Sequence, residues 1–230
     1  MSEAMKISRR SFVQTAAVAS GGLVLGLHIP PKGMWALAAM GGTELNAWVH
    51  IGTDDTITIR ASQTELGQGP TMGNLMMFAE EMECDWNNVT FEFATGRPEY
   101  TNPLVGLQLT GGSTATPGFW DVMRKAGAQT RHMLIGAAAK RWGVSASECT
   151  ARDSMVTHTS GKSASFGQLA ADAAGITPPE DPKLKSPAEF RLIGRPVKRL
   201  DSLQKVTGTA MFGMDQYVPG MVHGACLITP

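Results

Sequence analysis

The stretch ELGQGPT, Glu65–Thr71, separates two different hydrophobic patterns and so determines the predicted order of elements. Before it, apolar side chains alternate along 45–51 and again at 57–59, which predicts a β-hairpin with those two arms. After it, residues 70–84 carry apolar side chains at helical spacing, and Pro70 suits a first helical turn because its missing N–H would be unbonded there. The stretch therefore connects a strand to a helix.

Further along the chain, the pattern predicts one strand, one long loop and one long helix. Residues 89–93 alternate as a strand does, whereas 100–118 contain no periodic run, and loops of that length are usually functional or disordered. Pro117 and Gly143 are the expected ends of the helix, and its charged side chains, Arg124 included, are expected mostly outside the buried stripe.

The last third of the chain is expected to be less regular. Residues 144–175 predict a hairpin around Ser160 and Gly161 and a short helix that begins at Ser165. The fold class expected from all these elements is α+β. Its predicted parts are a domain at 39–176, a proline-rich linker at 177–190 and an incomplete unit at 191–230 with short strand-like runs. No helix closes this last unit, which indicates a truncated domain or one completed by another chain.

Composition excludes several classes of protein. The chain has 230 residues, 43% of them hydrophobic and 17% charged, as in a globular protein that buries a core. Lys plus Arg equals Asp plus Glu at 20 each, with no basic stripe, so no nucleic-acid partner is expected. The cysteines, Cys84, Cys149 and Cys226, have no paired spacing, so we expect buried apolar residues rather than zinc or iron–sulfur ligands.

Residues 1–38 have the three regions of a twin-arginine export signal. Arg9 and Arg10 lie in the motif SRRSFV, a mild apolar stretch follows at 16–27, and Ala36-Leu37-Ala38 is a small-x-small cleavage site. The alternative is a basic amphipathic helix. The export signal predicts a protein of the periplasm, or of the periplasmic face of the inner membrane, that folds before export.

Two glycine-containing loops, each followed by a helix, are the candidate binding features. Gly67, Gln68 and Gly69 form the first, and helix N-termini with glycines nearby can bind phosphate. The sequence LTGGSTATPG forms the second and is rich in hydroxyl groups. Each also has a simpler explanation, a structural turn for the first and a solvated loop with a helix cap for the second.

The chain contains no self-sufficient active site. Nucleophile-elbow, zinc-protease, P-loop and Rossmann glycine motifs are all absent. We expect Glu80, Glu81 and Glu83 to be solvated on an exposed helix face, and His132 to be a partly buried packing residue. No catalytic residue and no metal ligand is assigned.

Four segments together resemble a known family. TELGQGPT, GGSTATPGFWDVMRKAGAQTRHMLIGAAAKRW, FRLIGRPVKRLD and KVTGTAMFGMDQYVPGMVHGA are similar to the molybdopterin-binding large subunit of the xanthine dehydrogenase/aldehyde oxidase family. The exported branch with isoquinoline 1-oxidoreductase beta subunits is the most similar. The resemblance extends over residues 7–230, which correspond to the N-terminal portion of such subunits.

The resemblance implies an α/β sandwich portion of a molybdopterin-binding domain, followed by the start of an α/β hammerhead domain. It implies that Gly67, Gln68 and Gly69 contact molybdopterin cytosine dinucleotide, and that Gly112, Ser113 and Thr114 lie near it. The implied reaction is hydroxylation of an N-heterocycle or oxidation of an aldehyde. The implied partners are a small subunit with [2Fe–2S] clusters, possible cytochrome acceptors, and a second chain that supplies the rest of the large subunit.

Two hypotheses follow from the short length compared with that family. Either this chain is one part of a split molybdenum hydroxylase and is inactive alone, or it is a truncated, cofactor-free exported binding or remnant protein. Glu65, although adjacent to the glycine turn, is not assigned as the catalytic base.

Overall fold

The computed structural model describes residues 42–228, which form an α+β structure, as expected. A four-stranded sheet, in the order β1-β2-β3-β4, contains β1 (Gly42–Asn46), β2 (Val49–Gly52), β3 (Ile57–Ala61) and β4 (Val89–Phe93). The pairs β1–β2 and β2–β3 are antiparallel, and the pair β3–β4 is parallel. The hairpin and the strand at 89–93 are thereby confirmed.

The prediction of the hairpin is wrong in one respect, because its first arm, residues 45–51, consists of two strands rather than one. The Asn46 side-chain oxygen accepts the Trp48 N–H at 2.8 Å, and the chain reverses there so that β1 pairs with β2. The alternation of apolar side chains continues through this turn. A period of two therefore could not distinguish one long arm from two short strands.

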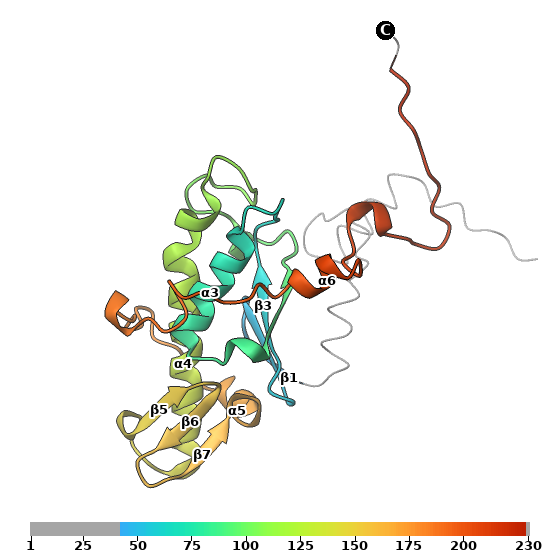
Figure 1. Cartoon of the computed structure of the whole chain (residues 1–230). Coiled ribbons are helices and arrows are strands. Elements are labelled where there is room, and N and C mark those ends of the chain that lie inside the picture. The colour runs from blue at the N-terminus through green and yellow to red at the C-terminus, as the bar shows by residue number, and fades with distance from the viewer. Residues whose placement is uncertain (1–41, 229–230) are drawn as a thin grey trace, which may run out of the picture. The chain divides into compact units, whose positions relative to one another are not determined.

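Two long helices pack together on one face of this sheet (Figure 1). Helix α3 (Pro70–Met82) connects β3 to β4, and α4 (Ala115–Trp142) follows β4 and ends at Gly143 in the left-handed conformation. Helix α4 begins two residues before the predicted Pro117. The helices approach closely at Gly127, where a β-carbon would lie 2.4 Å from the Phe78 carbonyl oxygen.

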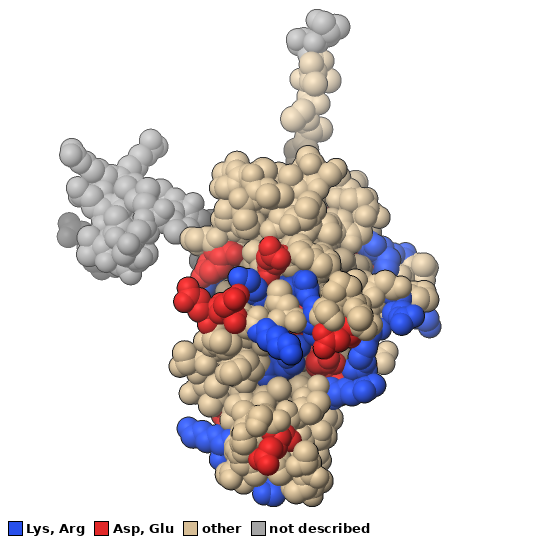
Figure 2. All heavy atoms as spheres, turned by 90° about the vertical axis from the view of Figure 1, so that its left-hand side faces the viewer, with Lys and Arg blue, Asp and Glu red and all other residues tan. Residues whose placement is uncertain are grey.

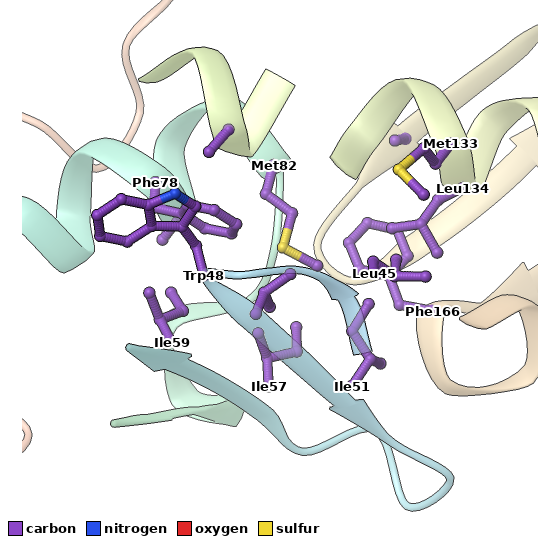
Figure 3. Close-up of a cluster of buried hydrophobic side chains, with 14 of the residues drawn as sticks. Leu45, Trp48, Ile51, Ile57, Ile59, Phe78, Met82, Met133, Leu134 and Phe166 are labelled. Carbon is purple, nitrogen blue, oxygen red and sulfur yellow. The ribbon is translucent and has the colours of Figure 1, made fainter. Parts of the chain in front are cut away.

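The core lies between the sheet and these helices, where apolar side chains from both layers meet (Figure 3). Ile51, Ile57 and Ile59 point from the sheet toward Phe78 and Met82 of α3, and all five are fully buried. Burial of each such side chain contributes about 1.5–3 kcal/mol to folding.

A second, three-stranded antiparallel sheet lies near the C-terminal end of α4 (Figure 1). It contains β5 (Cys149–Arg152), β6 (Met155–His158) and β7 (Ser163–Ser165), and α5 (Phe166–Ala173) follows. The predicted hairpin and helix are confirmed, and Ser165 forms a capping box with Gln168. Strand β5 was not predicted. Short 3₁₀ turns occur at Trp86–Asn88, Pro98–Tyr100, Ala146–Glu148, Pro187–Glu189 and Gly213–Asp215.

The prediction that the α3 glutamates are solvated is wrong. Glu80 and Glu81 are 3% and 0% exposed. Residues 183–201, here called the strap, lie across α3 and cover them (Figure 1). Glu80 accepts backbone N–H groups of Arg191 and Leu192 at 2.9 and 2.6 Å, and the Lys185 ammonium also contacts it. Because these partners lie more than a hundred residues away, a local pattern could not indicate them.

Three further expectations also differ from the structure. Arg124 is buried, because it pairs with Glu81 across the two helices. His132 is exposed, and so is Cys226, whereas Cys149 is buried as expected and Cys84 is half-buried. These side chains were placed from local spacing alone, which cannot show what packs against a surface.

The C-terminal segment contains one short helix, α6 (Ser202–Val206). The strand-like runs expected after residue 191 form no strand within the part that the structure describes, up to residue 228. A strand needs a neighbour for its backbone hydrogen bonds, and this segment has none among those residues. Many of its apolar side chains are exposed, Met214 by 98% and Val222 by 88%.

The predicted signal segment 1–38 lies outside the described residues, and the predicted domain boundaries stay predictions. Of the helices within 42–228, none is both long and apolar enough to cross a membrane.

Candidate functional site

The two predicted loops meet at one edge of the four-stranded sheet. Strands β3 and β4 are parallel, so their carboxyl ends lie at the same edge, where α/β proteins commonly bind ligands. Residues 62–69 lead from β3 into α3, and 94–114 lead from β4 into α4. The two helices therefore begin side by side, with the Asn74 side chain of α3 donating to the Ala115 carbonyl oxygen of α4 at 3.4 Å.

A hollow of about 560 Å³ lies between these loops. Its lining consists of Leu66, Gln68, Gly69, Pro70, Thr110, Gly111, Ser113, Ala115 and Thr116. The structure thus brings three of the six predicted residues, Gln68, Gly69 and Ser113, to one hollow. The other three, Gly67, Gly112 and Thr114, lie beside it in the same loops.

The first loop needs glycine for its backbone conformation. Gly67 and Gly69 have φ of 105° and 98°, values that other residues rarely adopt. A β-carbon at Gly67 would have no atom within 4 Å, so packing does not require glycine there. Between them, the exposed Gln68 accepts the Leu66 N–H at 2.7 Å through Oε1. Its Nε2 donates to no group within residues 42–228, and Gln68 is among the residues that line the hollow.

Helix α3 does not offer its N-terminus freely to an anion. Pro70 has no N–H, and the Thr71 N–H donates to the Glu65 carboxylate at 3.2 Å. Glu65 thus compensates the positive end of the helix dipole. Its other carboxylate oxygen accepts from Arg199. Because both of its carboxylate oxygens accept hydrogen bonds, Glu65 is not free to act as a base.

Helix α4 has the more open N-terminus. Thr114 is its N-cap, but the Thr114 hydroxyl accepts no N–H of the helix; it donates to the Gly111 carbonyl oxygen at 2.9 Å. The N–H groups of Ala115 and Thr116 have no acceptor in the described part of the chain. Unpaired N–H groups and a positive dipole end at α4 favour an anionic ligand in the hollow.

Two buried amide side chains, which sequence analysis did not identify, support the loops. Asn102 is fully buried; its Nδ2 donates to the Thr114 hydroxyl at 3.0 Å, and its Oδ1 accepts the Leu104 N–H at 3.0 Å. The Gln63 side-chain nitrogen donates to the Ser62 carbonyl oxygen at 3.2 Å, and the Gln63 backbone oxygen accepts the Thr71 hydroxyl at 3.2 Å. Polar residues in irregular loops carry no periodic signal, so only their partners reveal these roles.

The hollow is neutral, because no charged side chain lines it. Residues 101–120 contain no Asp, Glu, Lys or Arg. Figure 2 shows a broad uncharged area above a belt of charged side chains. A ligand there would meet backbone N–H groups, hydroxyls and one amide rather than ion pairs. Within residues 42–228, no group of three His, Cys, Asp or Glu side chains is arranged to bind a metal ion.

The α+β fold agrees with that of a cofactor-binding domain. Residues 8–216 match the Molybdopterin cofactor-binding domain family, and the chain belongs to that family. It therefore contains part of a molybdopterin-binding domain, as the resemblance implied.

Two curated proteins are similar over nearly the whole chain. The beta subunit of isoquinoline 1-oxidoreductase from Brevundimonas diminuta is 32% identical, over 96% of this chain and 33% of that protein. Membrane-bound aldehyde dehydrogenase (pyrroloquinoline-quinone) of Gluconacetobacter polyoxogenes is 34% identical, over 99% of this chain and 30% of that protein. The chain thus spans about a third of the length of these relatives.

More distant similarities were also found. A nicotinate dehydrogenase subunit from Pseudomonas putida is 26% identical, over 81% of this chain and 15% of that protein. Among solved structures, quinoline 2-oxidoreductase from Pseudomonas putida 86 has a TM-score of 0.42 and 17% identity, over 57% of this chain and 17% of that one.

Proposed function

We propose that this chain binds part of molybdopterin cytosine dinucleotide within an exported molybdenum hydroxylase. The observation that carries the proposal is the hollow between the Gln68 turn and the start of α4. It offers donors without any acidic side chain, which suits the phosphates of a dinucleotide. The residues present therefore fit the phosphate-bearing part of the cofactor.

Each side of the hollow has its own role in this proposal. The N–H groups of Ala115 and Thr116, with the Ser113 hydroxyl, bind phosphate oxygens. Gln68 donates through Nε2, and the glycines beside it allow close approach to the backbone. When bound, the cofactor supplies the oxidation of an N-heterocycle or an aldehyde. This chain binds and orients it.

The complete enzyme, as we propose it, requires other chains. A second chain supplies the remainder of the large subunit, a small subunit carries [2Fe–2S] clusters, and a cytochrome accepts the electrons. Two relatives carry the word subunit in their names, which supports an assembly of several chains. The twin-arginine motif at Arg9 and Arg10 supports export to the periplasm or the periplasmic face of the inner membrane.

Two other outcomes are distinguished by cofactor analysis. The name of one relative specifies pyrroloquinoline quinone, so that compound must be assayed beside molybdenum. A cofactor-free binding or remnant protein is the other outcome. The native complex is purified through this chain, and molybdenum, cytidine monophosphate released by acid, and pyrroloquinoline quinone are quantified. Stoichiometric molybdenum and cytidine monophosphate are expected, and a complex with neither would refute the proposal.

The variant Gln68→Ala tests the site itself. Loss of a hydrogen bond to a charged group costs about 1.5–3 kcal/mol, or about 10- to 150-fold in affinity. The matched control is Gln129→Ala, since Gln129 lies on α4 and donates to the Pro179 carbonyl oxygen at 3.0 Å, away from the hollow. Gln68→Ala should lose cofactor without a change in melting temperature. Equal cofactor loss in both variants would count against the site.

A further inference from the structure

Arg199, at the end of the strap, contacts the acidic residue that precedes the glycine turn. Its Nη2 donates to Glu65 Oε1, and its Nε and Nη2 donate to the two oxygens of Asp201, each at 2.9 Å. Lys205 also pairs with Asp201, at 2.6 Å. The side chain of Glu65 is only 6% exposed, so Arg199 is the counter-charge that compensates its loss of hydration.

Glu65 connects Arg199 to the glycine turn through its two carboxylate oxygens. One carboxylate oxygen is held by Arg199, and the other accepts the Thr71 N–H at 3.2 Å. The left-handed Gly67 and Gly69 lie between these two attachments. Within the turn itself, the structure shows one other hydrogen bond, from the Leu66 N–H to Gln68. The Glu65 carboxylate is therefore one of two attachments that close the loop around Gln68; the other is the Thr71 hydroxyl, which donates to the Gln63 carbonyl oxygen at 3.2 Å.

The strap determines where Arg199 lies. It follows α3 from the Glu80 end toward the Glu65 end and then continues into α6 (Figure 1). Near the end of the strap, the Trp86 indole N–H donates to the Lys198 carbonyl oxygen at 3.1 Å, one residue before Arg199. A β-carbon at Gly69 would lie 3.9 Å from Arg199 Nη1, so the guanidinium is beside the turn.

We propose that Arg199 is a positioning residue for the hollow, because it holds Glu65 and thereby fixes the Gly67–Gly69 turn in its binding conformation. The strap and α6 are thus coupled to ligand binding at the hollow. This inference rests on the proposed function for its ligand, but the effect on the turn is a property of this chain alone.

The chemistry of arginine explains why this residue suits the role. Its planar fork binds Asp201 and Glu65 at once, and a single ammonium group lacks that geometry. Without Arg199, the Glu65 carboxylate would have to move toward solvent to regain hydration. The Thr71 N–H would then lose its acceptor, and the glycines would leave the turn free to adopt other conformations.

The first test measures amide hydrogen exchange in the full chain, without any cofactor. Arg199→Gln should exchange the Thr71 and Leu66 amides at least about threefold faster at unchanged global stability, and Arg199→Lys should be intermediate. The matched control is Arg141→Gln, since Arg141 also donates through Nε and Nη2 to an aspartate, Asp172, at 2.9 and 2.6 Å. Wild-type exchange rates in Arg199→Gln would overturn the inference.

The second test measures cofactor retention in the purified complex. Arg199→Gln should retain severalfold less molybdenum and cytidine monophosphate than Arg141→Gln. Faster exchange with undiminished retention would overturn the coupling to binding. If the wild-type complex contains no molybdopterin, the proposed function fails, and the exchange experiment alone decides whether Arg199 positions the turn.

Discussion

Glu81 of α3 and Arg124 of α4 form a buried ion pair, with Oε1 2.6 Å from Nη2 and 2.9 Å from Nε. Glu81 also accepts the backbone N–H of Lys185 at 3.1 Å, which attaches the strap to both helices. Three segments distant in sequence therefore meet at one carboxylate. The site depends on this junction, because α3 and α4 must stay parallel for their N-termini to share the hollow.

Removal of this carboxylate should destabilise the chain strongly. Glu81→Ala leaves Arg124 buried without a counter-charge, and breaking such a pair costs about 3–5 kcal/mol. Urea unfolding measures the loss. The control is Glu99→Ala, whose solvent-exposed pair with Arg97 should contribute little to stability. If both variants lost similar free energies of unfolding, the buried pair would contribute no more to stability than the exposed one.

Two glycines within helices should respond oppositely to alanine. A β-carbon at Gly127 would lie 2.4 Å from the Phe78 carbonyl oxygen, so Gly127→Ala should force α3 and α4 apart and cost about 1–3 kcal/mol. At Gly73 the nearest atom would be the Thr116 hydroxyl, 4.0 Å away. Gly73→Ala should therefore stabilise α3 by about 0.4–1 kcal/mol. Thermal unfolding measures the stability of each variant. Equal changes in stability for Gly127→Ala and Gly73→Ala would contradict the close approach of α3 and α4 at Gly127.

Acid should release the strap through Glu80. Burial raises the pKa of this carboxyl. The Lys185 ammonium and the N–H groups of Ile193 and Leu192 together lower the pKa by more than burial raises it, so the pKa of Glu80 lies below its ordinary value. A lowered pKa in the folded state gives stability that is present above the unfolded value of about 4.3. That stability is lost as the pH falls through the folded value.

Urea unfolding from pH 7 down to pH 3 tests this prediction. The wild-type free energy of unfolding should fall more steeply below about pH 5 than that of Glu80→Gln, which has no charge to lose. Asp181→Asn is the control, because the side chain of Asp181 is 88% exposed. Parallel curves for the wild type and Glu80→Gln would refute the role of this carboxylate.

The three cysteines should differ in reactivity. Cys226 is exposed, whereas burial raises the pKa of the Cys84 and Cys149 thiols above the ordinary value and disfavours the reactive thiolate. Brief alkylation of the native chain at pH 8 should therefore modify Cys226 first. Peptide mass spectrometry reports the sites. Cys226→Ser should leave the folded chain almost unmodified, and prompt labelling of Cys149 would contradict its burial.

Local pattern predicted most elements because each has a short-range cause. Helix α3 follows from apolar spacing after Pro70, and Gly143 ends α4 because a left-handed residue terminates a helix. Ser165 starts α5 through a hydrogen bond to a residue three positions away. The division of 45–51 into two strands was missed, because the same alternation occurs on both sides of the turn at Asn46.

The sequence by itself therefore determined most of the elements, the family and the two loops that carry Gln68 and Ser113. Only the tertiary structure decided that these loops share one hollow, because the parallel pairing of β3 and β4 brings their carboxyl ends together. It also decided that Glu81 is buried and that Arg199 reaches Glu65. Such contacts join residues 43 and 134 positions apart, and no local period encodes a partner at that distance.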